Sequence, residues 1–491
     1  MASSSSSPPP PPPFMPRRRT LAVGGGLLAV AGLFGGLTAA AESASNVTPR
    51  LGVENAGPRA VTPVLSARRV PEFLVRPQAA RRLRMALVPA MVGVPETHCV
   101  VVASGAETLF AANPATPMAA ASNQKIVTAI AALDTLGADT RLTTRVAATA
   151  APVDGVVNGD LWVVGGGDPA IDSATYQATL RFGPTPHTSA EGLADQIVAA
   201  GVRQVTGGVR GDASRYDDQR VVPTWPDRYL TQNQVGPLSS LAMNDGKTVA
   251  VLPGPAPTPR PAEDPAAAFA SSVTQLLQAR GVTVTGAPAS GVAPESLATV
   301  VEVPSLTVGE LVGQMLTWSD NNTAELLVKE IGREVKGEGS TAAGLQAVRD
   351  DLAERELPLD GIELVDGSGL DPTNRLTCSL LIESLASDGP DGPLANGLAV
   401  GGETGTLSDD FVRSPARGRV RAKTGTLRGV SALSGWVETD RGADVRFAIV
   451  LNAPTGDLSA EQLSVERRLP EALLSYPDAV DPATLRPEGP R

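Results

Sequence analysis

Histidine and cysteine are scarce in this chain of 491 residues, which has two of each. A zinc hydrolase takes three or four ligands from histidine, cysteine and carboxylates, and the sequence contains no HExxH, HxxEH or paired CxxC motif. His187 lies in a Pro-rich stretch, and no GxSxG turn is present to hold a nucleophilic serine for a Ser-His-Asp triad. We therefore expect no metal ion, no cofactor and no catalytic role for His98 or His187.

Basic residues are outnumbered by acidic ones, 41 to 52, which gives a formal charge of −11 with histidine neutral. Binding to the phosphates of DNA or RNA needs clustered Lys and Arg, so we expect no nucleic-acid partner. Lysine occurs at only five positions, so a lysine inside a catalytic motif is informative. The five are Lys125, Lys247, Lys329, Lys336 and Lys423.

The N-terminal region has the pattern of a targeting segment. Residues 1–16 are mostly Ser and Pro of low complexity, which cannot form a core, and three arginines precede an uncharged run over residues 20–41. Residues 1–41 are predicted to be a signal peptide, which the small residues at 38–41 favour, or a membrane anchor, since the run is about long enough to span a bilayer. Either alternative exports the chain to the cell wall or periplasmic space, and the second attaches it to the membrane.

Residues 42–84 contain proline breaks and few aromatics, which predicts a linker, so we expect the folded part to begin at Met85. The spacing of apolar residues then predicts a hairpin, a helix, a separate β-rich unit, further helices, two strands and a last helix. A flexible tail is expected to follow. The expected ranges are 99–113 for the hairpin, 122–136 for the first helix, 137–303 for the β-rich unit with helices near 190–200 and 266–280, 306–335 and 341–355 for the further helices, 430–438 and 444–451 for the strands, 459–475 for the last helix and 477–491 for the tail.

Three short motifs stand in chain order. Each motif alone is weak, but counting gives a chance of roughly one in ten thousand that all three occur in this order. Together they predict an enzyme that acts through a nucleophilic serine. The motifs are S-x-x-K, S-D-N and K-T-G, and their residues are Ser122 and Lys125, then Ser319, Asp320 and Asn321, then Lys423, Thr424 and Gly425.

The first two motifs supply the groups that acyl transfer needs. Ser122 and Lys125, three residues apart at the start of a helix, share one face about 5 to 6 Å apart, so an uncharged lysine amine can remove the serine proton. Burial, or a neighbouring Lys423 ammonium, would lower the pKa of the lysine and keep its amine neutral. Ser319 can pass the proton to the leaving amine, and Asn321 can pair with a peptide group of the acyl donor.

The third motif fits recognition of the end of a substrate. Lys423, on a predicted strand, and the Thr424 hydroxyl suit a terminal carboxylate. Gly425 is expected to let the substrate approach the strand backbone closely. The amide N–H groups of Ser122 and Thr426 are expected to form the oxyanion hole.

The chain resembles the low-molecular-mass class C penicillin-binding proteins, which are D-Ala-D-Ala carboxypeptidases with DD-endopeptidase activity. The resemblance implies an α/β (α+β) fold in which a serine β-lactamase or penicillin-binding transpeptidase-like domain, residues 85–136 and 304–476, carries a β-rich domain, residues 137–303, inserted between S-x-x-K and S-D-N. That insert is short for members with two inserted domains, so a complete smaller third domain is not expected. Beside the three motifs, the blocks that carry the resemblance are NPATPMAAASNQKIVTAIAAL, GGGDP, GDASRYD, GPLSSLAMNDG, SDNNTAE and DGSGLDPTN.

The resemblance also implies an activity. It suggests an exported serine DD-peptidase that removes terminal D-Ala from peptidoglycan stem peptides or cleaves D-Ala crosslinks through an acyl-enzyme on Ser122. Peptidoglycan stem peptides would be its substrates and β-lactam antibiotics its inhibitors. Two alternatives stay open: a β-lactamase, against which the long insert argues, and a penicillin- or peptidoglycan-binding protein without turnover, against which the intact motifs argue.

Some residues outside the motifs carry weaker expectations. Cys99 and Cys378 are an even pair in a chain predicted to be exported, which favours a disulfide over two buried thiols. Residues 366–369 are expected to form a structural loop that borders the cleft. The larger aromatics near the motif blocks are expected to be buried and not stacked on a substrate; these are Trp225, Tyr229 and Trp318.

Overall fold

The computed structural model describes residues 71–252 and 258–478, which all belong to one compact unit. The predicted signal peptide or anchor, the predicted linker up to residue 70 and the predicted tail from residue 479 lie outside these residues. Among the helices of the described residues, none combines the length and the apolar character needed to cross a membrane.

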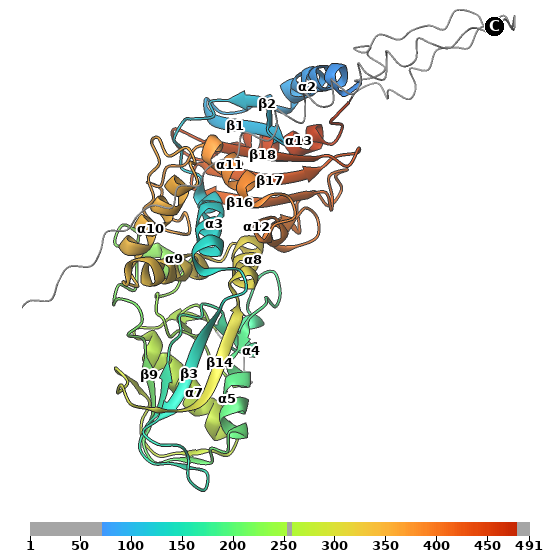
Figure 1. Ribbon diagram of the computed structural model, residues 1–491. Helices are drawn as coiled ribbons and strands as arrows, with labels where there is room; N and C mark the ends of the chain where they lie inside the picture. The colour runs from blue at the N-terminus through green and yellow to red at the C-terminus, as the bar shows by residue number, and fades with distance from the viewer. Residues whose placement is uncertain (1–70, 253–257, 479–491) are drawn as a thin grey trace, which may run out of the picture. The chain divides into compact units, whose positions relative to one another are not determined.

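A six-stranded antiparallel sheet joins segments from the two ends of the described chain (Figure 1). Its strand order is β15, β16, β17, β18, β1, β2, so the predicted hairpin of β1 and β2 lies beside the last strand. The strands are β1 (Thr97–Ser104), β2 (Glu107–Ala112), β15 (Ala399–Val400), β16 (Val420–Leu427), β17 (Val430–Glu438) and β18 (Asp444–Asn452).

Helices cover both faces of this sheet, so successive residues of a strand enter different apolar cores. On β1, Val101 enters the core shared with α3, α8, α9 and α11, and Val100 enters the core shared with α2 and α13. The first core sets the position of the helix that follows Ser122. The helices and 3₁₀ turns of this region are α2 (Pro71–Ala90), η2 (Ala121–Asn123), α3 (Gln124–Leu136), α8 (Val308–Trp318), α9 (Asn321–Lys336), α10 (Thr341–Glu354), α11 (Cys378–Asp388), α12 (Pro393–Gly397), η3 (Gly405–Leu407) and α13 (Ala460–Leu473).

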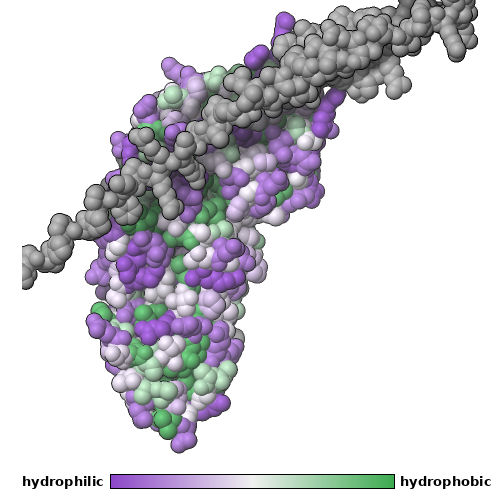
Figure 2. Space-filling view, viewed as in Figure 1, coloured by the Kyte–Doolittle hydropathy of each residue, from purple (hydrophilic) through white to green (hydrophobic). Residues whose placement is uncertain are grey.

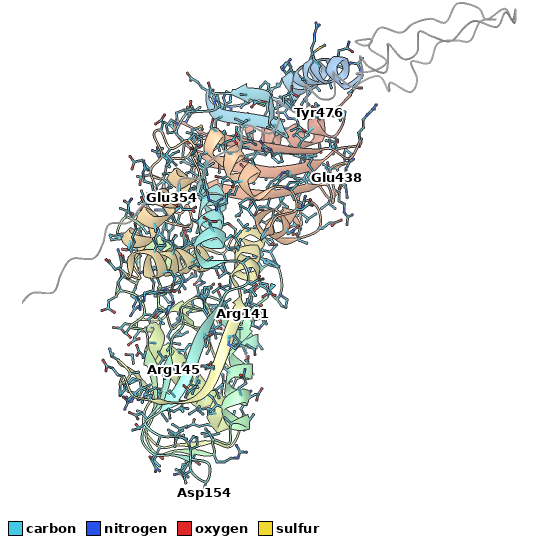
Figure 3. All side chains as sticks on the ribbon, in the orientation of Figure 1. Arg141, Arg145, Asp154, Glu354, Glu438 and Tyr476 are labelled. Atoms are coloured by element: carbon cyan, nitrogen blue, oxygen red, sulfur yellow. A yellow bond between two sulfur atoms is a disulfide. The ribbon has the colours of Figure 1, made fainter. Side chains whose placement is uncertain are left out.

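The residues between α3 and α8 build a core of their own on a five-stranded sheet with the order β13, β9, β5, β3, β14. The antiparallel pair β3 and β14 leads away from α3 and back to α8, and Figure 3 shows Arg141 at the end of β3 near α8 and Asp154 at the far end of the insert. Hydrophilic and hydrophobic residues are intermixed on the face in view (Figure 2). The elements are β3 (Arg141–Ala148), β4 (Val156–Val157), β5 (Leu161–Val164), β6 (Ile171–Asp172), α4 (Ala174–Gln177), β7 (Thr188–Ser189), α5 (Ala190–Ala199), β8 (Gln204–Val205), β9 (Val209–Asp212), α6 (Arg228–Thr231), β10 (Lys247–Thr248), β11 (Arg260–Pro261), α7 (Pro265–Ala279), β12 (Thr283–Val284), β13 (Ala289–Ser290) and β14 (Ala298–Thr307).

The predicted start of the folded part is wrong. Helix α2 begins at Pro71, inside the predicted linker, and Ala79, Leu83 and Leu87 are buried against the sheet. These residues recur every four positions and so share one helix face, a period that the prolines at Pro77 and Pro89 obscured in the sequence.

Two other features of the helices differ from the prediction. The stretch 306–335 is not continuous: α8 ends and α9 begins around Ser319, which has a φ of 62°. Helix α11 was not predicted, although Thr377 caps its first turn by accepting a hydrogen bond from the Leu380 amide at 3.0 Å. The predicted hairpin, the strands β17 and β18 and the helices α3, α5, α7, α10 and α13 are confirmed.

Candidate active site

Ser122 lies in the 3₁₀ turn η2, directly before α3. Ala121 has a φ of 47°, a left-handed conformation that is uncommon for a residue with a side chain, so the chain bends sharply just before the helix. Lys125 lies in the first turn of α3, and its Nζ is 3.0 Å from Ser122 Oγ. The two residues therefore meet on one helix face, as their spacing predicts.

Three oxygen atoms surround the Lys125 amine, which is fully buried with 0% of the residue exposed. Besides contacting Ser122, Nζ donates hydrogen bonds to Asn321 Oδ1 and to the Ser368 carbonyl oxygen, each at 2.7 Å. A neutral amine has two N–H donors and one lone pair. It can therefore serve both carbonyl oxygens and still accept the proton of Ser122.

Burial lowers the pKa of Lys125 from 10.5 to about 8. The carboxylates of Asp366, Glu325 and Asp320 act in the opposite direction, because negative charge stabilises the ammonium form. Of the two predicted causes, burial is therefore the one that acts on this amine. Lys423 is itself buried, and its pKa is lowered well below 10.5, first by burial and then by the charge of Lys125.

The S-D-N residues lie at the junction of two helices. Ser319 ends α8 in a left-handed conformation, and Asp320 caps the first turn of α9. Asn321 Nδ2 donates to the Gln234 carbonyl oxygen at 2.6 Å, which leaves Oδ1 facing Lys125. Both ends of the Asn321 amide therefore have protein partners, and the contact with the lysine was not predicted.

A cleft opens beside this junction. Ser319 and Asn321 line it together with Tyr176 and Lys247 of the inserted region. Trp318, which was predicted to be buried, is partly exposed and lines the cleft as well. The inserted region thus contributes directly to the surroundings of the motif residues.

The K-T-G residues lie on β16, next to the nucleophile turn. Lys423 Nζ donates to the Thr424 carbonyl oxygen at 3.0 Å, and the Lys423 carbonyl oxygen accepts from Asn123 Nδ2 at 3.2 Å. The Thr424 hydroxyl is 2.9 Å from the Thr406 hydroxyl. Thr424 is partly exposed and Thr426 is exposed, so both can meet a bound ligand.

Gly425 lies directly against the nucleophile turn. A Cβ atom at this position would lie 2.7 Å from the Ala120 carbonyl oxygen, 2.8 Å from Asn123 Nδ2 and 3.2 Å from the Ser122 amide nitrogen. Gly425 therefore makes room for the turn that holds the nucleophile, a role that was not predicted. This close approach brings the Ser122 amide beside the strand that carries Thr426, as an oxyanion hole built from both amides requires.

Residues 366–369 form a buried loop whose Ser368 carbonyl oxygen contacts the lysine, and none of the four is among the residues that line the cleft described above. Glu325, which is fully buried on α9, accepts hydrogen bonds from the amides of Gly367 and Ser368. Glu325 was not predicted to be a site residue. Its spacing of four residues from Asn321 places both side chains on one face of α9 and is the signal that indicates it.

The predicted burial of two aromatics is confirmed, since Trp225 is 6% and Tyr229 is 7% exposed. Trp225 Nε1 donates to Asp366 Oδ2 at 2.8 Å, and the Tyr229 hydroxyl donates to the Leu370 carbonyl oxygen at 2.9 Å. Both polar groups therefore satisfy their hydrogen bonds inside the fold and hold the inserted region against the 366–371 segment.

Cys99 and Cys378 form a disulfide, which confirms the predicted pairing and ties β1 to the start of α11. His98 contacts the Pro95 carbonyl oxygen through Nδ1 at 2.7 Å, and His187 contacts a backbone carbonyl oxygen in its own loop. Neither contact involves a motif residue. Within residues 71–252 and 258–478, no group of three or more His, Cys, Asp or Glu side chains is arranged to hold a metal ion.

Comparison with known proteins agrees with the motifs and the fold. The chain matches the D-Ala-D-Ala carboxypeptidase 3 (S13) family over residues 85–258 and 253–468. It is 30% identical over 443 residues to the D-alanyl-D-alanine carboxypeptidase of Actinomadura sp. (strain R39), covering 75% of this chain and 79% of that protein. It is 31% identical over 425 residues to carboxypeptidase DacB of Mycolicibacterium smegmatis, covering 81% of this chain and 86% of that protein.

A solved structure shares the fold. The crystal structure of penicillin binding protein 4 from Haemophilus influenzae superposes with a TM-score of 0.65 at 20% identity, covering 79% of this chain and 99% of that chain. The predicted α+β class is thereby confirmed. Because the family match spans most of the chain and includes all three motifs, the chain belongs to the D-Ala-D-Ala carboxypeptidase 3 (S13) family, whose members are class C penicillin-binding proteins.

Proposed function

We propose that this protein is an exported serine DD-peptidase that removes terminal D-Ala from peptidoglycan stem peptides, or cleaves D-Ala crosslinks, through an acyl-enzyme on Ser122. The observation that carries the proposal is the fully buried Lys125 amine, whose Nζ lies 3.0 Å from Ser122 Oγ. A lysine in this environment is neutral often enough near pH 7 to take the serine proton. Family membership supports the substrate class.

The proposed reaction has two halves. In the first, Ser122 Oγ attacks the carbonyl carbon of the penultimate D-Ala while Lys125 takes its proton, and the amides of Ser122 and Thr426 stabilise the oxyanion. Ser319 then delivers a proton to the leaving nitrogen as the C–N bond breaks, and it regains a proton from Lys125, whose amine is again neutral. In the second half, water attacks the ester carbonyl carbon and loses a proton to Lys125, which returns this proton to Ser122 Oγ as the ester C–O bond breaks.

Recognition of the substrate's free carboxylate is assigned to β16. Burial disfavours the ammonium form of Lys423, and an incoming carboxylate supplies the negative charge that stabilises this form. The Thr424 hydroxyl, which is partly exposed, adds a directional donor. A substrate with a free C-terminal carboxylate is therefore favoured over one with a neutral end.

Two features support action outside the cytoplasm. The Cys99–Cys378 disulfide is typical of proteins that fold in an oxidising compartment. The sequence of residues 1–41 has the charge and hydropathy pattern of an export signal or anchor. We propose that the chain acts in the cell wall or periplasmic space, where peptidoglycan is found.

The experiment that tests the function measures three reactions of the purified protein side by side. These are D-Ala release from a peptide that ends in D-Ala-D-Ala, cleavage of a crosslinked muropeptide, and reaction with a labelled penicillin. We expect catalytic release of D-Ala, together with penicillin bound one-to-one at Ser122 and released slowly. Rapid penicillin turnover without D-Ala release would instead identify a β-lactamase, and penicillin binding without any peptide cleavage would identify a binding protein.

A further inference from the structure

The Lys125 amine is held in part by a backbone carbonyl, so its position depends on the loop to which that carbonyl belongs. Residues 366–369 pass between α3 and α9. On one side, three successive carbonyl oxygens of the loop accept hydrogen bonds from side chains of α3. Gln124 Nε2 donates to Asp366 at 3.2 Å, Thr128 Oγ1 to Gly367 at 2.7 Å and Lys125 Nζ to Ser368 at 2.7 Å.

The amide groups of the same loop face α9. Glu325 Oε1 accepts the Gly367 N–H at 3.0 Å and the Ser368 N–H at 2.7 Å. Glu325 lies one helical turn after Asn321, on the same face of α9. Helix α9 therefore positions Lys125 in two ways. Asn321 Oδ1 contacts the lysine directly, and Glu325 binds the loop whose Ser368 carbonyl oxygen contacts the lysine.

Close packing leaves the loop little freedom to rearrange. A Cβ atom on Gly367 would lie 2.5 Å from Val328 Cγ2, and one on Gly369, where φ is +81°, would lie 2.0 Å from the Ala121 carbonyl oxygen. Asp366 fixes the rest of the turn by accepting the Gly369 N–H at 2.8 Å. Only glycine fits at both positions, so the loop backbone contacts α9 and the nucleophile turn directly.

Glu325 is a costly choice for packing alone. A carboxyl group with 0% exposure loses its hydration, and an apolar side chain of similar volume would fill the same space at lower cost. Burial and the nearby Asp366 raise the pKa of Glu325 to about 8, while the Ser368 and Gly367 hydrogen bonds act against this rise. The oxygen that accepts the two amide N–H groups is the feature that an apolar residue would not reproduce, and it is present in both protonation states.

We propose that Glu325 is a positioning residue for the general base: its carboxyl group fixes the 366–369 loop so that the Ser368 carbonyl oxygen holds the Lys125 amine against Ser122. Glu325 does not itself meet the substrate. The inference rests on the roles of Ser122 and Lys125 in the proposed function. The charged groups that face Lys125 are Glu325, Asp366, Asp320 and Lys423.

The test compares E325M, which removes the acceptor oxygens of this side chain, with a matched control, E330M. Glu330 lies on the same helix and is only 1% exposed, but it bonds to Arg215 and Tyr216, away from the loop. The full chain is titrated for active sites, and the rate constant of acylation by labelled penicillin is measured per active molecule between about pH 6 and 10. A lesion that only lowers the folded fraction changes neither this rate constant nor its pH midpoint.

We expect E325M to acylate about 10- to 100-fold more slowly, because a small displacement of the base costs this much when proton transfer depends on alignment. Its pH midpoint should move to lower pH, because Lys125 loses a fixed acceptor and, in the molecules in which Glu325 is ionised, a nearby negative charge. An acceptor and a negative charge both stabilise the ammonium form, so their loss lowers the pKa of the amine. E330M should keep the wild-type rate constant and midpoint.

The outcomes separate this inference from the proposed function. If the wild-type protein is not labelled on Ser122, the proposed function fails. If the wild type is labelled and E325M shows the same rate constant and midpoint, or E330M changes as much as E325M, the positioning role is overturned. Should E325M not fold, E325D carries the test, since it keeps the carboxyl group but withdraws it from the loop, and wild-type kinetics in E325D would equally refute the role.

Discussion

The proposed base makes acylation strongly dependent on pH, and the structure sets the size of the effect. With a pKa of about 8, roughly one tenth of Lys125 is neutral at pH 7. At the ordinary value of 10.5, only about one part in three thousand would be neutral. Burial thus increases the amount of neutral lysine that can act as the base about 300-fold at pH 7.

The assay is the rate of acylation by labelled penicillin as a function of pH. The rate should rise about tenfold per pH unit below pH 8 and level off above it, because only the neutral amine accepts the serine proton. K125R should lower the rate by at least ~10², since a guanidinium does not lose its proton in this range. The matched control is K329R, because Lys329 is equally buried but pairs with Asp217 outside the site.

Two results would refute this reasoning. A rate that is independent of pH between 6 and 9 would mean that the serine proton goes to a group other than Lys125. A rate that climbs until about pH 10.5, the value of an exposed lysine, would mean that burial does not lower the pKa of this amine. Near-normal acylation by K125R would also mean that a group other than Lys125 accepts the serine proton.

Three further predictions concern the nucleophile, the carboxylate site and the disulfide. S122A should abolish labelling by penicillin and leave the circular dichroism spectrum unchanged; label on another serine would contradict the assignment. T424V should lower kcat/KM roughly 10- to 150-fold for a peptide with a free D-Ala-D-Ala end and little for its C-terminal amide. T406V, which removes only the partner hydroxyl, should have a small effect on both, and an equal loss for both peptides in T424V would rule out carboxylate recognition. Alkylation of the unfolded protein without reductant should leave the mass unchanged, and replacing Cys99 and Cys378 by Ala should lower the free energy of unfolding by about 2 to 5 kcal/mol; two labelled thiols would show that the bridge is not formed in solution.

The sequence was sufficient for contacts that depend on helical spacing. The approach of Ser122 to Lys125 follows from a separation of three residues at a helix start, and the same rule applied to α9 indicates Glu325 from Asn321. Contacts made by backbone atoms of distant segments were not predictable in this way. The Ser368 carbonyl oxygen accepts a hydrogen bond from Lys125, which is 243 residues away in the sequence. The direction of a backbone carbonyl group cannot be predicted from the pattern of side chains in the loop.

Most of the few lysines in this chain are buried, including two that lie outside the motifs. Four of the five lysines are buried, each with 7% or less of the residue exposed. Two of these, Lys247 and Lys329, lie outside the motifs and pair with Asp245 and Asp217. Burial of a lysine therefore does not by itself indicate catalysis in this chain. What distinguishes Lys125 is that a serine and two carbonyl oxygens surround its amine, and that distinction needs the structure.

The inserted region also determines how the amine is held. The Asn321 side chain can present either its oxygen or its nitrogen to Lys125, and only the oxygen accepts a hydrogen bond from the amine. The Gln234 carbonyl oxygen, which belongs to the insert, accepts from Nδ2 at 2.6 Å and so fixes the amide with Oδ1 toward the lysine. Without that contact the amide could turn, and an N–H group facing Lys125 would compete with Ser122 for the lone pair of the base. The insert therefore takes part in positioning the proton acceptor through its contact with the S-D-N motif.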